Sequence, residues 1–262
     1  MRGRILRQVS SVFIKTVKEL YRNKITVFWT IVWPIIFLFL GIFIFYRGAP
    51  QSQAPQFRAG ITISMIVFSL MLSGFSTMPG IIAQDRASGL FLKLRSMPVQ
   101  QWKDSIGRIF GLLFYVLISA VLIGVIGIVL GARFNLSVES SFISLGFLIL
   151  ATLSAAGSGI IIGTFIKNIN GAIITGVGIA VVSMSLAGVT FPYSFLPGVL
   201  QGFSRFYPFS SSNAIISYML STQEFVGYNP MSAFQVIFTI VISIAIFIVS
   251  LVLYSKFCWR AD

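Results

Sequence analysis

Side chains that could carry acid–base or metal chemistry are sparse in this chain. It contains no histidine, which is the commonest general base and a common metal ligand. Its single cysteine, Cys258, has no second cysteine with which to form an internal disulfide. The six acidic residues are scattered near the ends of apolar stretches: Glu19, Asp85, Asp104, Glu139, Glu224 and Asp262. This pattern predicts no catalytic site and no metal site.

A short basic and amphipathic segment, Asp85–Ser96, offers binding chemistry instead. It lies between two long apolar stretches and is followed by Pro98. On a helical wheel its apolar face consists of Ala87, Leu90, Phe91 and Leu94. Leu92 points out of the polar face, and an apolar side chain among charges suits a groove on a partner. The sequence thus predicts a cytosolic docking helix, and the alternative is a basic loop whose amphipathicity is accidental.

The elements around this segment belong to a membrane protein. Of the 262 residues 56% are hydrophobic and 10% are charged, and the mean hydropathy is +0.94. A soluble domain of this length could not bury so much apolar surface. The net charge of +13 does not indicate nucleic acid, because Lys and Arg lie between apolar stretches rather than on one soluble face.

Six stretches are apolar enough, and approach or exceed the roughly 20 residues needed, to cross about 30 Å of hydrocarbon. They are Ile25–Tyr46, Phe57–Ile82, Ser105–Gly131, Phe142–Ile166, Ala172–Thr190 and Ala233–Tyr254. The predicted fold is therefore all-α and integral to the membrane, with one domain over residues 1–262. Fifteen of the 19 Lys and Arg residues lie at one set of span ends, which predicts a multi-pass protein of the cell membrane with both termini in the cytosol.

Two further segments flank the spans. Arg4–Lys24 has an apolar face opposite a basic one, which predicts an N-terminal interfacial helix over residues 1–24 with its apolar face in lipid. Phe191–Pro230 is mostly apolar but interrupted by four prolines. It predicts an outer-leaflet re-entrant hairpin of two short helices, near Ser194–Phe206 and Ser210–Leu220, and the alternative is a hairpin lying flat at the interface.

Glycine pairs spaced four residues apart occur in the third and fourth predicted spans. They are Gly107/Gly111, Gly127/Gly131 and Gly159/Gly163. Small residues at this spacing let helices approach closely. The pairs predict helix packing within one chain and say little about dimers.

In this order the segments resemble the six-span permease subunits of type-2 ABC transporters, whose members are mostly exporters. The resemblance covers nearly the whole chain. An amphipathic helix leads into a Trp-Pro in the first span, at Lys15–Pro34. The remaining motifs are Asp85–Gly89 with Ser96–Val99, and Phe191–Pro197 with Phe206–Pro208. The chain departs from the family pattern at Gln84-Asp85-Arg86, where Glu-Arg/Lys-Glu is usual.

The resemblance implies that two permeases pair around a pathway and that two cytosolic ATPase subunits bind below them. A homodimer is expected, with a heterodimer open. The chain has no Gly-x-x-x-x-Gly-Lys-Ser/Thr loop, so it is predicted not to be an enzyme, and ATP and Mg²⁺ are expected on the partner. The implied ATPase-coupling residues are Asp85, Arg86, Ser88, Gly89, Leu92, Lys93, Arg95 and Ser96. The basic residues of this set, Arg86, Lys93 and Arg95, could instead contact the headgroups of membrane lipids.

The resemblance also implies that the first, second and fifth spans line the pathway. Their polar or aromatic candidates are Thr30, Trp33, Ser64, Ser69, Ser73, Ser183 and Ser185, and the alternative is that the serines bond within the bundle. The predicted outer gate is Pro192, Leu196, Pro197, Phe206 and Pro208. Such a lining favours an amphipathic or lipid-like cargo. A stand-alone secondary transporter or channel is the main alternative, although no span carries the mid-membrane charge that such proteins usually keep. A membrane-embedded enzyme comes third.

Overall fold

A computed structural model describes residues 2–45, 54–96, 100–186, 189, 193 and 196–258. The described residues form helices and connecting turns, with no strand among them. The helices are α1 (Arg2–Arg22), α2 (Lys24–Val27), α3 (Trp33–Leu40), α4 (Ala54–Leu72), α5 (Met78–Ala87), α6 (Leu90–Arg95), α7 (Gln101–Val129), α8 (Val138–Phe165), α9 (Ile169–Leu186), α10 (Gly198–Phe206), α11 (Pro208–Leu220), α12 (Gln223–Val226) and α13 (Ala233–Leu253). Short π-helical turns join α2 to α3 and α4 to α5, and follow α3 and α13.

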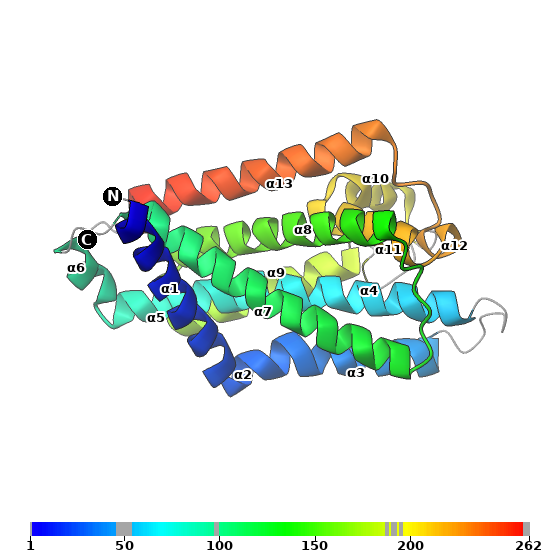
Figure 1. Cartoon of the computed structure of the whole chain (residues 1–262), viewed down its shortest axis with the longest axis horizontal. Helices are drawn as coiled ribbons and strands as arrows, with labels where there is room; N and C mark the ends of the chain where they lie inside the picture. Colours follow the sequence, from blue (N-terminus) through cyan, green and yellow to red (C-terminus); the bar gives the residue numbers. More distant parts are fainter. Residues whose placement is uncertain are drawn as a thin grey trace.

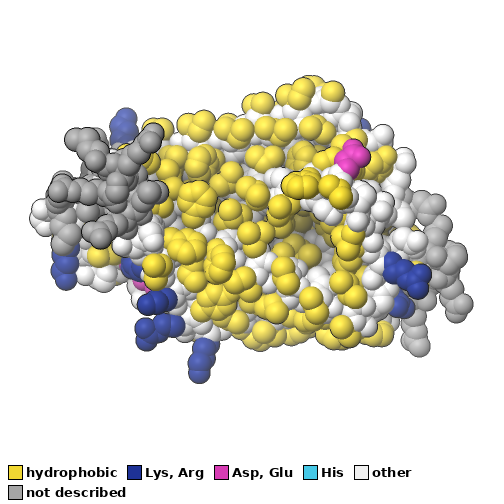
Figure 2. Space-filling view, viewed as in Figure 1, with side chains coloured by type: hydrophobic (Ala, Val, Ile, Leu, Met, Phe, Trp, Pro, Cys, Tyr) yellow, Lys and Arg dark blue, Asp and Glu magenta, His cyan; other side chains and the backbone are white. Residues whose placement is uncertain are grey.

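The helices form an elongated bundle with two distinct ends (Figure 1). α6 lies at one end, beside the last turns of α13, and this end is called the α6 end below. α10, α11 and α12 gather at the opposite end (Figure 1). Figure 2 shows apolar side chains across the middle of the visible face, with Lys and Arg toward the two ends. This distribution is what a bilayer requires of a spanning protein.

Within the described residues, five helical runs are long and apolar enough to cross a membrane. They are Lys24–Ile44, Ala54–Ala87, Gln101–Val129, Val138–Phe165 and Ala233–Cys258. The predicted integral membrane helical class is thus confirmed. The predicted fifth span, Ala172–Thr190, corresponds to α9, whose apolar part Ile169–Ser185 is shorter than the other five. A six-span count therefore stays a prediction.

The run from α4 to α5 is the most deeply buried of the five and forms the centre of the bundle. Glycines on the helices around it allow this close packing. A Cβ at Gly159 of α8 would collide with the carbonyl oxygen of Gly74, and one at Gly163 would meet Pro79. On α7, Gly107 faces Val12 of α1 and Gly127 faces Thr62 of α4, so both pack within the chain. Gly131 lies in the turn after α7.

The N-terminal helix is amphipathic as predicted, but its apolar face is placed differently. α1 packs along the first half of α7, where the rings of Phe13 and Phe114 lie 5.7 Å apart. Thr16 meets Gly111, and Leu20 is fully buried. This face therefore contacts protein, whereas the sequence predicts it in lipid. The smooth surface that glycine leaves on α7 explains why α1 settles there.

Candidate functional site

The predicted docking segment is two helices rather than one. α5 continues through Asp85 to Ala87, and the chain then turns at Ser88 and Gly89 before α6 begins. Gly89 has φ of 71°, a left-handed conformation that glycine adopts without the strain of a Cβ. Ser88 supports the turn, because its Oγ donates to the Asp85 carbonyl at 3.0 Å. The prediction of one continuous helix over Asp85–Ser96 is therefore wrong at Ser88 and Gly89, where the chain turns.

α6 nevertheless has one buried and one exposed side. Phe91 is 4% exposed, and its ring stands edge-on to Tyr254 with the ring centroids 6.2 Å apart. Leu92 is 63% exposed, and Lys93 and Ser96 are also exposed. The predicted outward position of Leu92 is thus confirmed. The side chain of Arg95 lies outside the described residues.

Directly inside α6 lies a set of ionic contacts, called the charged cluster: Lys15, Asp85, Asp104, Arg108 and Tyr254. Asp85 pairs with Lys15 Nζ at 2.7 Å and with Arg108 Nη2 at 2.6 Å. Asp104 accepts from Arg108 Nε at 2.8 Å and from the Tyr254 hydroxyl at 2.5 Å. The cluster thus joins α1, α5, α7 and the turn after α13.

Arg108 is the centre of the charged cluster. It is 1% exposed and contacts both carboxylates, which balance its charge. Its guanidinium carbon also lies 5.9 Å from the centroid of the Phe91 ring, within cation–π range. Phe91 therefore links the exposed side of α6 to the cluster.

Glu19 lies beside the cluster on α1. Its Oε1 is 3.4 Å from Lys15 Nζ. Burial raises the pKa of the Glu19 carboxyl, because leaving water penalises its charged form, while Lys15 acts in the opposite direction.

Two residues predicted to face a partner point inward instead. Asp85 is 6% exposed because cations from α1 and α7 hold it. Arg86 Nη2 donates to the Thr164 carbonyl at 3.1 Å and contacts Cys258 Sγ at 3.3 Å. Both side chains are thus used within the chain, and the exposed part of the predicted docking set begins at Ser88.

The cluster is not predictable from the sequence because its members are far apart along the chain. The acidic residues are scattered in sequence, although the fold brings Asp85 and Asp104 to one guanidinium. One local signal was present, since Asp104 and Arg108 are spaced i,i+4 at the start of an apolar helix. Lys15 and Tyr254 carry no comparable signal.

The predicted pathway residues differ in how deeply they are buried within the single chain. Thr30, Ser64, Ser69 and Ser73 are buried between helices of the chain. The Thr30 hydroxyl is 2.6 Å from the Tyr115 hydroxyl, and Ser69 Oγ donates to the Thr30 carbonyl. Hydroxyls in membrane helices often bond their own or a neighbouring helix in this way. These contacts join the first span to the second and third.

The other pathway candidates are less buried. Trp33 is half-buried in a row of aromatic rings, 5.3 Å from both Trp29 and Phe37. Ser183 is half-buried, and Ser185 is exposed and donates to the Val181 carbonyl at 3.1 Å. Among the predicted pathway residues, these three are the ones whose side chains are not fully buried within the single chain.

The predicted hairpin does contain two short helices, α10 and α11. Leu196 and Pro208 are buried, whereas Pro197 is exposed. Phe206 is partly exposed and its ring lies 5.1 Å from that of Phe238 on α13. Pro192 lies outside the described residues. The helices thus pack on the bundle at the end opposite α6.

The sequence was also compared with models of known protein families. A family model described as ABC-2 type transporter matches residues 7–220. The matched range begins within α1 and ends with α11, so it includes α6 and most of the charged cluster. Comparison with curated proteins gives no match.

Proposed function

The chain belongs to the ABC-2 type transporter family, and we propose on this premise that it is the permease subunit of an ATP-driven exporter. A separate cytosolic ATPase supplies the energy, and ATP and Mg²⁺ bind to that partner. Two ATPase subunits would serve two permease chains, which we expect to be identical. Both termini lie in the cytosol, on the side of the cell membrane where α6 is exposed.

The observation that carries this proposal is the construction of α6. It presents an exposed Leu92 beside Lys93, and directly behind them Phe91 is buried. Leu92 can insert into a groove on a partner, and the buried Phe91 fixes α6 to the bundle. A helix built in this way suits contact with a partner that moves. Lys93 would add attraction to an acidic ATPase surface.

The charged cluster supports a second part of the proposal, in which a displacement of α6 is transmitted to the membrane-spanning helices. A push on α6 moves Phe91 against Arg108 and Tyr254, which hold Asp85 and Asp104. Because the cluster joins α1, α5 and α7, these helices are expected to shift together. The N-terminal helix and the docking helix would thus respond as one unit.

The cargo we propose is amphipathic or lipid-like. Trp33, Ser183 and Ser185, which are not fully buried in the single chain, are the candidates to border a pathway between two permeases. α10 and α11 are the candidate outer gate, with Phe206 and Pro197 exposed at its surface.

Co-purification of the ATPase tests this function. The chain is expressed with the ATPase encoded beside it and is purified through a tag on the permease. We expect the wild-type chain to retain the ATPase, and the Leu92→Asp, Lys93→Glu variant to lose it, because the apolar anchor and the attractive charge are both removed. Gel filtration checks that the permease stays folded.

Val199→Asp is the matched control, because Val199 is an 86% exposed apolar residue on α10 at the opposite end. It should leave ATPase retention unchanged. If the wild-type chain retains no ATPase and still transports in vesicles without ATP, the proposal is wrong and a stand-alone transporter or channel is favoured.

A further inference from the structure

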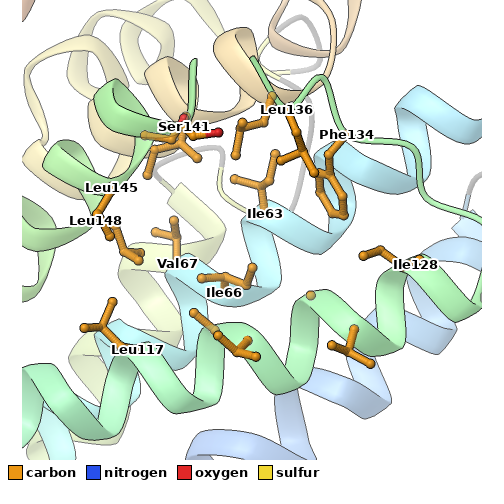
Figure 3. A pocket seen from close by; sticks show the side chains of 17 residues that line it. Ile63, Ile66, Val67, Leu117, Ile128, Phe134, Leu136, Ser141, Leu145 and Leu148 are labelled. Carbon is orange, nitrogen blue, oxygen red and sulfur yellow. The ribbon is translucent and has the colours of Figure 1, made fainter. Parts of the chain in front are cut away.

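A deep apolar groove lies between α7 and α8, with α4 as its floor (Figure 3). The groove is open to the outside of the chain, and its volume is about 450 Å³. The segment that includes Phe134 and Leu136 closes it toward the α10–α12 end, where α11 also contributes. Its lining side chains are apolar except for Ser141 and Ser144.

The dimensions of the groove match one leaflet of a bilayer. Along α7 its lining runs from Leu117 to Ile128, which is roughly 16 Å at the helical rise of 1.5 Å per residue. Half of a hydrocarbon core of about 30 Å is nearly the same length. The groove exists partly because α7 has Gly124 here, where an added Cβ would meet no atom within 4 Å. An extended acyl chain fits this shape.

One polar group in the groove has no bonding partner. Ser144 is 5% exposed, and its Oγ has no hydrogen-bond partner among the residues that the structure describes. A buried hydroxyl in this state has lost its hydrogen bonds to water without gaining a replacement, so an acceptor on a ligand would stabilise it. The ester carbonyl at the head of an acyl chain is an acceptor of the right kind for it.

Two arginines stand near the closed end of the groove. Arg58 Nη1 donates to the Leu130 carbonyl at 3.1 Å, and the Arg133 backbone N–H donates to the Pro55 carbonyl at 3.1 Å. The Arg133 side chain is exposed and precedes Phe134, which lines the groove. Neither arginine belongs to an ion pair within the described part of the chain. Guanidinium groups bind phosphate well.

We propose that this groove binds one acyl chain of an anionic phospholipid. The chain lies against α4 between α7 and α8, an ester carbonyl accepts from Ser144, and the phosphate sits near Arg133 and Arg58. This site lies farther along α7 than Asp104 and Arg108 of the charged cluster, and it does not depend on the ATPase-coupled role.

Photolabelling in nanodiscs tests the proposal on the full chain. The probe is phosphatidylglycerol with a diazirine in its acyl chain, and labelled peptides are mapped. We expect labelling to concentrate on residues 117–128 and 141–148. Gly124→Phe should reduce it there about tenfold, as a loss of 1.4 kcal/mol in binding would. Gly146→Phe on the exposed face of α8 is the control and should not, since it lies outside the groove.

A second arm tests the headgroup. Both lipids carry the phosphate, but the guanidinium of Arg133 repels the choline ammonium of phosphatidylcholine. Arg133→Gln should therefore reduce labelling by phosphatidylglycerol more than labelling by phosphatidylcholine, so the preference between the two lipids falls. Equal labelling of the wild type by the two lipids would overturn the anionic part of the proposal.

Other results would overturn the site itself. Equal labelling in Gly124→Phe and Gly146→Phe would mean that lipid only surrounds the protein. If Gly124→Phe does not fold, wild-type labelling spread evenly over the exposed spans would have the same meaning. A disulfide-linked dimer formed by Gly124→Cys in a Cys258→Ala background would show that a second copy covers the groove.

Discussion

Replacing Arg108 by Met is expected to destabilise the protein by roughly 3–5 kcal/mol, the usual effect of removing one partner from a buried ionic contact. The substitution keeps an unbranched apolar stem and removes the guanidinium group with its charge. Among the residues that the structure describes, Asp85 would keep Lys15 as its side-chain partner and Asp104 would keep the Tyr254 hydroxyl. Two carboxylates would then be buried with too little positive charge.

Thermal unfolding of the purified chain in detergent measures this effect. Arg22→Met is the matched control, because Arg22 is exposed at the end of α1 and surface substitutions usually change stability by less than about 0.5 kcal/mol. Arg108→Lys should fall between the two, since an ammonium group cannot contact both carboxylates as a guanidinium does. An Arg108→Met variant as stable as Arg22→Met would contradict the structural role of the cluster.

Replacing Phe91 by Ala is expected to separate ATP hydrolysis from transport. Leu92 and Lys93 remain available to the ATPase, but the ring that contacts Arg108 and Tyr254 is lost. We expect the ATPase to stay bound and to hydrolyse ATP, while transport falls at least about tenfold, equivalent to 1.4 kcal/mol of lost coupling.

Hydrolysis and cargo transport are measured together on the reconstituted complex. Phe142→Ala is the control, because Phe142 is an exposed phenylalanine on α8 at the other end. Phe91→Leu keeps most of the buried volume and removes the ring, so it distinguishes the contact with Arg108 from a packing defect. Unchanged transport in both Phe91 variants would show that force does not pass through this ring.

Features that depend on local periodicity were predictable from the sequence. The long apolar runs of α7, α8 and α13 must lie in lipid or in a core, whatever surrounds them. Leu92 is exposed as predicted, although the wheel ignored the turn at Gly89, because Leu90 to Leu94 form a helix on their own. Gly159 packs within the chain, as its spacing with Gly163 indicated.

Features that depend on tertiary contacts were not predictable. From the sequence, Asp85 is predicted to be a surface charge. In the structure it is buried, because Lys15 of α1 and Arg108 of α7 pair with it. Ser69 is predicted to border the pathway, with bonding inside the bundle as the alternative, and the structure shows its hydroxyl donating to the Thr30 carbonyl of the neighbouring span. In both cases the polar side chain contacts a helix that is distant in sequence. The spacing of residues along the chain does not predict such a contact.

Site-specific photocrosslinking from α6 tests the central claim most directly. A photoreactive amino acid replaces Leu92 in one sample and Val199 in another, and the complete transporter is irradiated in its membrane. The account predicts a covalent adduct between the permease and the ATPase from position 92 and none from position 199. An active complex that gives no ATPase adduct from position 92, or gives one from position 199, would contradict it.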